Sequence, residues 1–401
     1  MHILMIAPEP FFEPRGTPFS EYHRLRALSS MGHTVDLVTY PFGADREIPG
    51  VRIIRTLKPP FLSRIRIGPS WAKVPLDFFL SLTALRVGLS GRYDAVHSHE
   101  EGGAIGIVMA WLLGVPHLYD MHSSLPQQIS NFGYEKSRWL AVLFDRLERL
   151  MIRRSQVVIV ICPQLEEVVR EIDTDVPLVL IENAMGSGDA PTPGTGTAIR
   201  EELQLRPETP MVLYTGTFEH YQGLDLLFDA MPAVIAARPD VRFVMMGGEP
   251  PQVEAARARV AAAGIAASIL FTGQRPAADV PAYLDAADVL VSPRSTGTNT
   301  PLKLYQYLRS GRAIVATRLL THTQVLDDET SILTEPTPAS YAAGIIAAVG
   351  DRERARAIGA RAKAMADVKY SEEAYLAKTR DAMTRLARSA VRTARPRKSK
   401  V

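Results

Sequence analysis

The stretch 288–311, DVLVSPRSTGTNTPLKLYQYLRSG, holds residue types that can bind a phosphate group. An apolar run predicts a buried strand, a loop rich in Ser, Thr, Gly and Asn follows, and Thr300 and Pro301 then predict the start of a helix. A helix start offers free N–H groups and partial positive charge, to which Lys303 and the nearby Arg294 add two cations. The pattern fits a phosphate site, and it fits equally well an ordinary strand–loop–helix unit whose lysine is solvated.

Two groups of polar residues end apolar runs in the first half of the chain. His97 and His99 alternate along one predicted strand and precede the Glu100–Glu101 pair, and Asp120 and His122 end the next strand. A histidine at a strand end can contact a sugar hydroxyl or transfer a proton, although it can also be purely structural. The spacing offers the two alternating histidines no third ligand, so we predict no metal site.

Strands alternate with helices along the whole chain, which predicts an α/β protein with two Rossmann-like, doubly wound parallel-sheet domains facing each other across a cleft. In the first domain, Gly16 and Thr17 open a helix directly after the first strand and its loop. The domain lacks G-x-G-x-x-G, and no acidic residue ends its second strand, so nicotinamide binding is disfavoured.

A stretch dense in Gly, Pro, Ser and Thr marks the predicted domain boundary. We predict an N-terminal acceptor domain, a linker, a C-terminal donor domain, a C-terminal helix that packs back on the first domain and a disordered basic tail, at 1–184, 185–198, 199–370, 371–390 and 391–401.

The charge of the chain is unevenly distributed. The formal net charge is +3, but residues 384–401 contain seven basic residues and no acidic one, which leaves 39 basic against 43 acidic residues in the rest of the chain.

The single cysteine, Cys162, cannot form an internal disulfide, so we expect a cytoplasmic protein. The sequence contains no run of about 18 apolar residues, so we predict no membrane-spanning helix.

A second basic segment, Arg64–Arg92, also carries aromatic residues and has Asp77 as its only acid. Such a segment can lie in a membrane interface, or it can form a helix packed on its own domain with basic ends in water. We favour peripheral contact with the inner face of an anionic membrane, through this segment and the basic tail, over binding to nucleic acid. The basic and aromatic residues are Arg64, Arg66, Trp71, Lys73, Phe78, Phe79, Arg86 and Arg92.

The order of these pieces resembles the retaining glycosyltransferases of family 4, which have the GT-B fold. The resemblance covers roughly Met1 to Tyr375. The matching stretches include GTPFSEYHRLRALSSMGHTVDLVTY, DAVHSH, LVLIENAMG, YTGTFEHYQGLDLLFDAM, FVMMGGEP, FTGQRPAADVPAYLDAADVLVSPRS and LKLYQYLRSGRAIVAT.

The resemblance implies transfer of a sugar from a nucleotide-diphosphate donor to a glycan or lipid-linked acceptor, in cell-surface polysaccharide or glycolipid synthesis, without a metal or other cofactor. It implies that His122, ordered by Asp120, meets the donor sugar. The implied donor-binding residues are Gly16, Thr17, Gly216, Thr217, Gln222, Gly273, Arg294, Thr298, Thr300, Leu302, Lys303 and Gln306. The implied acceptor-side residues are Glu13, Arg15, Glu100 and Glu101.

Four positions depart from the family pattern. Its usual Arg and Lys after the first strand of the donor domain fall on Thr217 and Gln222, and its usual pair of glutamates falls on Thr298 and Gln306. Two cations that would stabilise a departing diphosphate are therefore missing. We expect Arg294 and Lys303, named above, to replace them.

Two alternatives keep the fold and change the role. The first is a sugar-nucleotide epimerase or hydrolase, in which His122, Glu100 and Glu101 would act as acid and base. The second is a non-catalytic partner subunit, which the four departures would explain.

Overall fold

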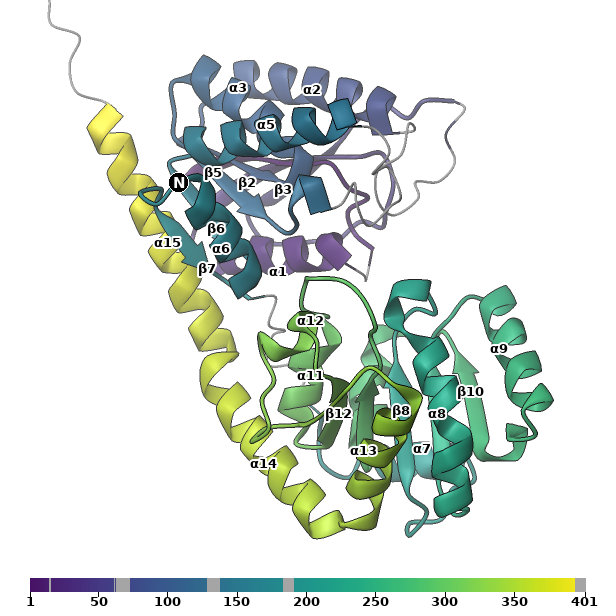
Figure 1. Cartoon of the computed structure of the whole chain (residues 1–401). Coiled ribbons are helices and arrows are strands. Elements are labelled where there is room, and N and C mark those ends of the chain that lie inside the picture. The colour runs from purple at the N-terminus through teal and green to yellow at the C-terminus, as the bar shows by residue number, and fades with distance from the viewer. Residues whose placement is uncertain (14–15, 61, 63–72, 128–137, 183–190, 394–401) are drawn as a thin grey trace, which may run out of the picture. The chain divides into compact units, whose positions relative to one another are not determined.

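A computed structural model describes residues 1–13, 16–60, 62, 73–127, 138–182 and 191–393, without the side chains of 138, 140 and 390–393 (Figure 1). The chain forms two compact units. Unit 1 comprises Met1–Asn183 and Tyr375–Val401, and unit 2 comprises Ala184–Ala374. The predictions for Arg15, Arg64, Arg66, Trp71 and the tail from residue 394 concern positions outside the described residues.

Unit 1 is built on a seven-stranded parallel sheet in the order β3-β2-β1-β4-β5-β6-β7. The strand order reverses between β1 and β4, whose register pairs Met5 with His97. The strands are β1 (His2–Ala7), β2 (Thr34–Thr39), β3 (Val51–Arg55), β4 (Ala95–His99), β5 (His117–Met121), β6 (Val157–Val160) and β7 (Leu178–Leu180).

Helices cover both faces of this sheet, because its strands are apolar on both sides. Leu4 and Ile6 of β1 pack under α2 and α3, whereas Ile3 and Met5 pack on α1 and α15. Figure 1 shows α2, α3 and α5 side by side over one face. The helices are α1 (Gly16–Ser30), α2 (Lys73–Ser90), α3 (Gly103–Leu113), α5 (Arg138–Arg154), α6 (Pro163–Ile172) and α15 (Glu372–Thr393).

The C-terminal helix α15 packs within unit 1. Its Ala382, Met383 and Leu386 are buried in the same core as Leu25 and Leu28 of α1. Because α15 reaches this core only after the whole of unit 2, the two ends of the chain stabilise the same unit.

Unit 2 has a six-stranded parallel sheet in the order β10-β9-β8-β11-β12-β13, which reverses between β8 and β11. Its strands are β8 (Met211–Thr215), β9 (Arg242–Met246), β10 (Ile269–Gly273), β11 (Val289–Ser292), β12 (Ala313–Thr317) and β13 (Ile332–Thr334). Its helices are α7 (Gly196–Glu202), α8 (Leu224–Ala237), α9 (Pro250–Ala262), α10 (Val280–Ala286), α11 (Lys303–Ser310), α12 (Leu320–Thr323), α13 (Pro338–Gly350) and α14 (Arg352–Lys369).

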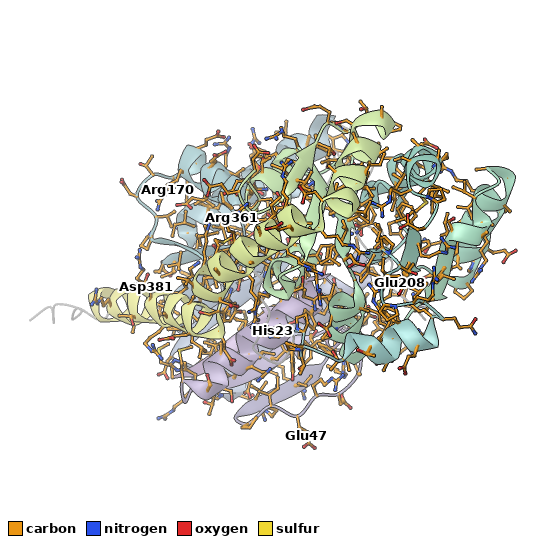
Figure 2. All side chains as sticks on the ribbon, turned by 90° about the horizontal axis from the view of Figure 1, so that it is seen from below. His23, Glu47, Arg170, Glu208, Arg361 and Asp381 are labelled. Carbon is orange, nitrogen blue, oxygen red and sulfur yellow. The ribbon has the colours of Figure 1, made fainter. Side chains whose placement is uncertain are left out.

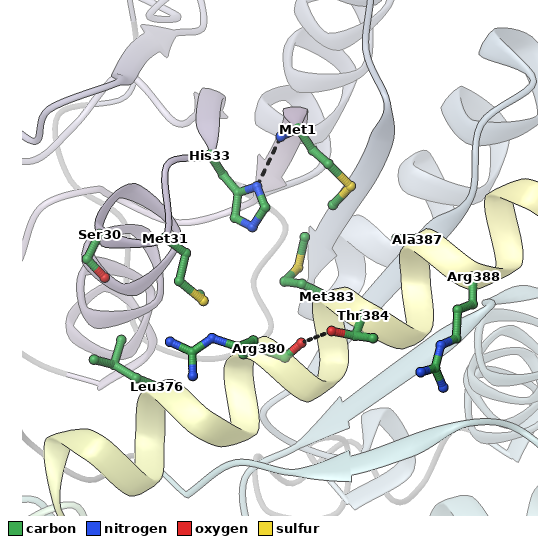
Figure 3. Close-up of a pocket in the computed structure, with 10 residues that line it drawn as sticks. All are labelled: Met1, Ser30, Met31, His33, Leu376, Arg380, Met383, Thr384, Ala387 and Arg388. Carbon is green, nitrogen blue, oxygen red and sulfur yellow. Dashed lines mark hydrogen bonds between the residues drawn. The ribbon is translucent and has the colours of Figure 1, made fainter.

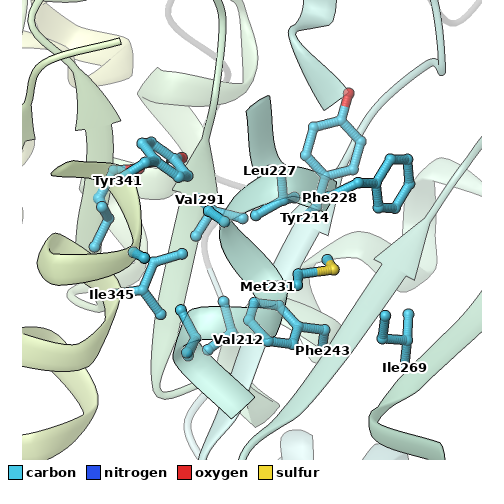
Figure 4. Close-up of a cluster of buried hydrophobic side chains, with 14 of the residues drawn as sticks. Val212, Tyr214, Leu227, Phe228, Met231, Phe243, Ile269, Val291, Tyr341 and Ile345 are labelled. Atoms are coloured by element: carbon cyan, nitrogen blue, oxygen red, sulfur yellow. Dashed lines mark hydrogen bonds between the residues drawn. The ribbon is translucent and has the colours of Figure 1, made fainter. Parts of the chain in front are cut away.

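The core on one face of the second sheet joins α8 and α13 to the strands. Leu227 and Met231 of α8 and Ile345 of α13 pack with Phe243 and Val291 from the sheet (Figure 4). Charged side chains lie on the outside of each unit, as Glu47 in unit 1 and Glu208 and Arg361 in unit 2 illustrate (Figure 2). Both units therefore have the doubly wound architecture that the alternation predicts.

Three local predictions need correction. Strands β3 and β13 were not predicted, since both are short edge strands with little apolar signal. Helix α11 begins at Lys303 with Leu302 as its N-cap, so Thr300 does not cap it and Pro301 lies before it. Helix α7 begins at Gly196, so residues 196–198 of the predicted linker are helical.

Candidate functional site

The carboxyl ends of β1, β4 and β5 bring a cluster of polar residues to the point where the strand order of unit 1 reverses. This is the position at which open α/β sheets bind ligands. His97 and His99 lie on β4, Asp120 lies on β5, and His122 directly follows the end of β5. All four residues are buried. Parallel pairing of His99 with Asp120 explains how two separate sequence motifs meet.

A buried ion pair forms the centre of this cluster. Arg24 of α1 is 2% exposed, and its Nε donates to Asp120 Oδ2 at 3.0 Å. Burial alone would raise the pKa of Asp120, but the charge of Arg24 and the nearby His122 hold that pKa well below its usual value. Arg24 Nη1 also donates to Thr379 Oγ1 of α15 at 3.2 Å. Helix α15 thus helps to hold Arg24 in place, and Arg24 in turn holds the carboxylate of Asp120.

His122 is oriented by two neighbours. Its Nε2 lies 3.2 Å from Asp120 Oδ1 and 3.3 Å from His99 Nδ1. Burial lowers the pKa of His122, but the charge of Asp120 outweighs this, so the net pKa is raised. Burial lowers the pKa of His97 and holds that of His99 well below its usual value. Of these three rings, His122 is therefore the one that most readily carries a proton.

Three buried carboxyl groups lie near this cluster. Burial raises the pKa of Glu21 to about 7 and that of Glu100 to about 7, and burial with the neighbouring charge of Glu21 raises the pKa of Glu9 well above its usual value. The Ser123 hydroxyl donates to Glu100 Oε2 at 2.8 Å. Each of these carboxyl groups can hold a proton near neutral pH, which suits groups that hydrogen-bond to neutral hydroxyls.

A metal ion does not fit this cluster well. Among the described residues, His97, His99 and Asp120 offer ligand atoms within 4.8 Å of one another. Asp120 is therefore a possible third metal ligand, which the sequence spacing did not reveal. The Arg24 guanidinium already occupies this carboxylate, and its charge would repel a cation.

The remaining first-half predictions fall on the surroundings of the cluster. Glu101 forms an ion pair with Lys73 of α2. Gly16 opens α1 with a φ of 55° and is exposed, and Thr17 follows it in the first turn. Glu13 is partly buried at the edge of the described segment.

In unit 2, Lys303 lies at the strand ends beside the reversal of strand order. Its Nζ donates to Thr215 O at 3.2 Å and to Gln222 Oε1 at 3.4 Å, and it stands 4.0 Å from the centroid of the Tyr214 ring. Tyr307, one turn further along α11, accepts from Thr215 N at 3.0 Å. Two contacts to the same residue of β8, Thr215, therefore fix the start of α11.

Arg294 is the second cation of this region. Its Nη1 donates to Asn299 O at 2.8 Å, its guanidinium lies 5.2 Å from the centroid of the Tyr221 ring, and its Nε is buried without a hydrogen-bond acceptor among the described residues. Burial lowers the pKa of Arg294, and burial and then the charge of Arg294 hold the pKa of Lys303 well below its usual value. No carboxylate of the described residues forms an ion pair with either side chain. The pair is electrostatically prepared for an anion.

Glycines let the loops around these cations pack closely. Gly247 has a φ of 119°, and a Cβ atom there would lie 1.9 Å from Gly216 O. Its N–H donates to Gly273 O at 2.8 Å. A Cβ atom at Gly216 would lie 3.2 Å from Tyr214 Oη and 3.6 Å from Lys303 Nζ, so a bare backbone borders the lysine.

The structure thus brings Gly216, Gln222, Arg294 and Lys303 together, with Gly273 one loop away. Thr217 joins them through its carbonyl, which accepts from Tyr214 Oη at 2.7 Å. The other predicted donor residues of unit 2 lie on the same loop and on α11. Thr298 O accepts from Gln324 Nε2 at 2.7 Å, Thr300 Oγ1 is buried without a partner among the described residues, and Gln306 lies three residues after Lys303 on α11.

Sequence reasoning missed Glu9, Glu21 and Arg24 in unit 1 and Tyr214 and Tyr221 in unit 2. A signal existed for two of them. Glu21 and Arg24 lie between apolar positions of α1, on the face that is turned to the core. Charged residues at such positions are almost never buried without partners, which would have marked them as part of a polar network.

A separate hollow lies at the opposite edge of the first sheet. This cavity of about 760 Å³ is lined by residues near the amino ends of β1 and β2, including Met31 and His33, and by Leu376, Arg380 and Met383 of α15 (Figure 3). Since the strand ends that carry His122 are at the other edge, this cavity is not part of the polar cluster.

Family models match both halves of the chain. The model described as "Glycosyl transferase 4-like domain" matches residues 22–184, and the one described as "Glycosyl transferases group 1" matches residues 209–351. The chain belongs to the family 4 glycosyltransferases. This glycosyltransferase is similar to the phosphatidyl-myo-inositol mannosyltransferase of Mycobacterium tuberculosis, with 24% identity over 381 residues, 90% of this chain and 91% of that protein.

Solved structures support the GT-B fold of this glycosyltransferase. The sucrose-phosphate synthase of Thermosynechococcus elongatus superimposes with a TM-score of 0.79 at 21% identity, over 97% of this chain and 99% of that one. Anabaena HepE in complex with UDP-glucose superimposes with a TM-score of 0.73 at 16% identity, over 96% of this chain and 99% of that one. The predictions of the family, of the fold and of a sugar-transferring enzyme are therefore confirmed.

Proposed function

We propose that this glycosyltransferase moves a sugar, with retention of its anomeric configuration, from a nucleotide-diphosphate donor to a glycan or lipid-linked acceptor. The observation that supports the donor class best is the pair Lys303 and Arg294, two partly buried cations without a carboxylate partner among the described residues. A departing diphosphate supplies the missing negative charge. Basic side chains that are already in place can stabilise this charge as it develops, at little cost in reorganisation.

The first-unit cluster would position the sugar. His122, held by Asp120 and raised in pKa, can donate a hydrogen bond to a sugar hydroxyl. The carboxyl groups of Glu9, Glu21 and Glu100, whose pKa values are raised, can bind other hydroxyls in their protonated form without repelling the diphosphate. Attack on the face from which the leaving group departs requires no protein nucleophile. We propose that no metal takes part, since protein cations hold the phosphates.

The acceptor is the less constrained half of the proposal. The mycobacterial relative is named for transfer of mannose to phosphatidyl-myo-inositol, which supports a glycolipid or polysaccharide acceptor. In the described part of the chain, no helix has the length and apolarity that crossing a bilayer requires. We place the enzyme on the cytoplasmic face of a membrane, with the basic segment 64–92 and the tail as peripheral contacts.

A calorimetric panel of UDP, GDP, ADP, CMP and TDP tests the donor class. We expect one nucleoside diphosphate to bind clearly more tightly than the others. The phosphates of all the diphosphates contact the same cations, so only the contacts to the base distinguish them. CMP, with a single phosphate, should bind weakly. Failure of every nucleotide to bind would contradict the proposal and favour a non-catalytic partner subunit.

Binding of the preferred diphosphate is expected to take up a proton. The pKa of Lys303 is well below its usual value in the free protein, and a bound diphosphate would raise it again. Affinity should therefore fall as the pH rises through the range between these two pKa values. Calorimetry in buffers of different ionisation enthalpy, above about pH 7 where the phosphate is fully ionised, measures this uptake. In Lys303→Arg, whose guanidinium stays charged, the uptake should disappear. Equal uptake in parent and variant would contradict the assignment to Lys303.

A further inference from the structure

The helical layer over one face of the first sheet exposes apolar side chains. Of the 15 large hydrophobic residues that are exposed among those described, 11 lie on α2, α3 and α5. Trp111 is 78% exposed and Trp139 is 66% exposed. The others on these helices are Val74, Phe78, Leu82, Leu89, Val108, Leu112, Val142, Leu143 and Leu150. A monomeric soluble protein rarely gathers so many on one face.

These side chains follow the helical repeat on the outer side of each helix. In α2 the residues 74, 78 and 82 are exposed, while Leu76, Leu80 and Ala84 are buried against the sheet. In α5 the residues 139, 142, 143 and 150 are exposed. Helix α3, GAIGIVMAWLL, has no charged residue at all and contacts both α2 and α5. The three helices lie side by side (Figure 1), so their apolar stripes form one surface, which we call the outer helical face.

The exposed charges of the outer helical face that have no ion-pair partner among the described residues are all positive, whereas the 45% exposed side chain of Asp145 is paired with Arg149. Arg86, Arg146 and Arg153 are exposed. The acids of the described part of these helices are engaged or turned inward: Asp77 accepts from Tyr40, Asp145 pairs with Arg149, and Glu148 is 2% exposed and accepts from Leu125 N at 2.7 Å. Exposed tryptophan, aliphatic side chains and arginine without free acid are the composition of an interfacial membrane surface.

We infer that the outer helical face of unit 1 is a docking surface for an anionic lipid bilayer, with Trp111 and Trp139 inserted at the headgroup level. This goes beyond the segment 64–92 and the tail, since α3 and α5 carry most of the exposed apolar residues. The inference rests on the proposed lipid-linked acceptor for its purpose, but not for its geometry. A docked bilayer would let the enzyme meet its acceptor at the membrane surface.

The charge pattern favours a bilayer over a second copy of the chain. A symmetric dimer through this face would set the same patch against itself, and so would bring exposed arginines against exposed arginines. An anionic leaflet instead attracts each arginine, at about 1 kcal/mol per residue near the surface.

Vesicle co-sedimentation tests the inference. The parent should bind phosphatidylcholine vesicles that contain phosphatidylglycerol and bind pure phosphatidylcholine vesicles much more weakly. Trp111→Ser and Trp139→Ser should each weaken partitioning roughly tenfold, because each removes one large apolar side chain from the interface. Arg146→Gln and Arg153→Gln should each weaken it roughly fivefold on anionic vesicles only.

All four substituted residues are exposed, so folding should be unaffected. Val368→Ser is the matched control, since Val368 is 78% exposed on α14 of unit 2 and should leave vesicle binding unchanged. Nucleotide binding by the same proteins separates the two proposals: serine variants that lose vesicles and keep nucleotide support the docking surface. Equal binding of neutral and anionic vesicles, no binding of either, or a parent dimer that the serine variants convert to monomer would overturn it.

Discussion

Replacement of Lys303 by methionine is expected to lower kcat/KM for sugar transfer by roughly 10²- to 10³-fold and to weaken binding of the preferred nucleoside diphosphate. Its Nζ contacts a carbonyl oxygen, an amide oxygen and the Tyr214 ring, and it forms no ion pair with a described carboxylate. The charge that Lys303 gains with the proton taken up on binding is therefore available to the incoming phosphate. Methionine keeps the length of the side chain and can stay on the Tyr214 ring, so the melting temperature should change little.

The matched control is Lys363→Met. Lys363 forms an exposed i,i+4 pair with Asp367 at 2.6 Å, which contributes about 0.5 kcal/mol or less to stability and should not affect turnover. Arg294→Leu should also weaken diphosphate binding, and the effects of the two changes should not simply add, because both cations act on the same diphosphate. Unchanged binding in both Lys303→Met and Arg294→Leu would remove these residues from the donor site.

Asp120→Asn is expected to lower the free energy of unfolding by about 3–5 kcal/mol, since it leaves Arg24 buried without its counter-charge. Arg24 and Asp120 are 2% and 0% exposed, and water cannot replace the lost partner. The same change removes the charge that raises the pKa of His122, so the pKa of this ring should fall. Denaturant unfolding measures the first effect, and NMR titration of the ring measures the second.

The double variant Arg24→Met/Asp120→Asn separates the lost pair from the lost carboxylate. It removes both buried charges, so it should be more stable than either single variant. Asp381→Asn on α15 is the control, because Asp381 pairs with Arg385 at the surface and its loss should cost about 0.5 kcal/mol or less. If Asp120→Asn were as mild as this control, the pair would not hold the cluster together.

The confirmed parts of the sequence prediction follow from patterns that are local in the chain. Apolar runs placed both sheets, because strands of a parallel sheet that is covered on both faces must be apolar throughout. The runs at 3–7 and 211–215 and the helix 103–113 match β1, β8 and α3 closely. The departures from the family pattern at Thr217 and Gln222 can be read from the sequence alone. Lys303 and Arg294, the cations proposed to replace the missing ones, can also be read from the sequence. In the structure, Lys303 Nζ donates to Gln222 Oε1.

The remaining features depend on contacts between distant residues. The meeting of Arg24, Asp120 and Thr379 joins α1, β5 and α15, and no spacing in the chain reveals it. The same is true of the acidic pair Glu9 and Glu21, whose raised pKa values come from burial.

The outer helical face shows the limit of sequence periodicity most clearly. Along α2, both the buried stripe with Leu76 and Leu80 and the exposed stripe with Phe78 and Leu82 are apolar. Periodicity reports that a helix has an apolar side, but when two sides qualify it cannot say which one packs on the sheet. Only the tertiary structure decided that, because the sheet buries one stripe of each helix and leaves the other exposed.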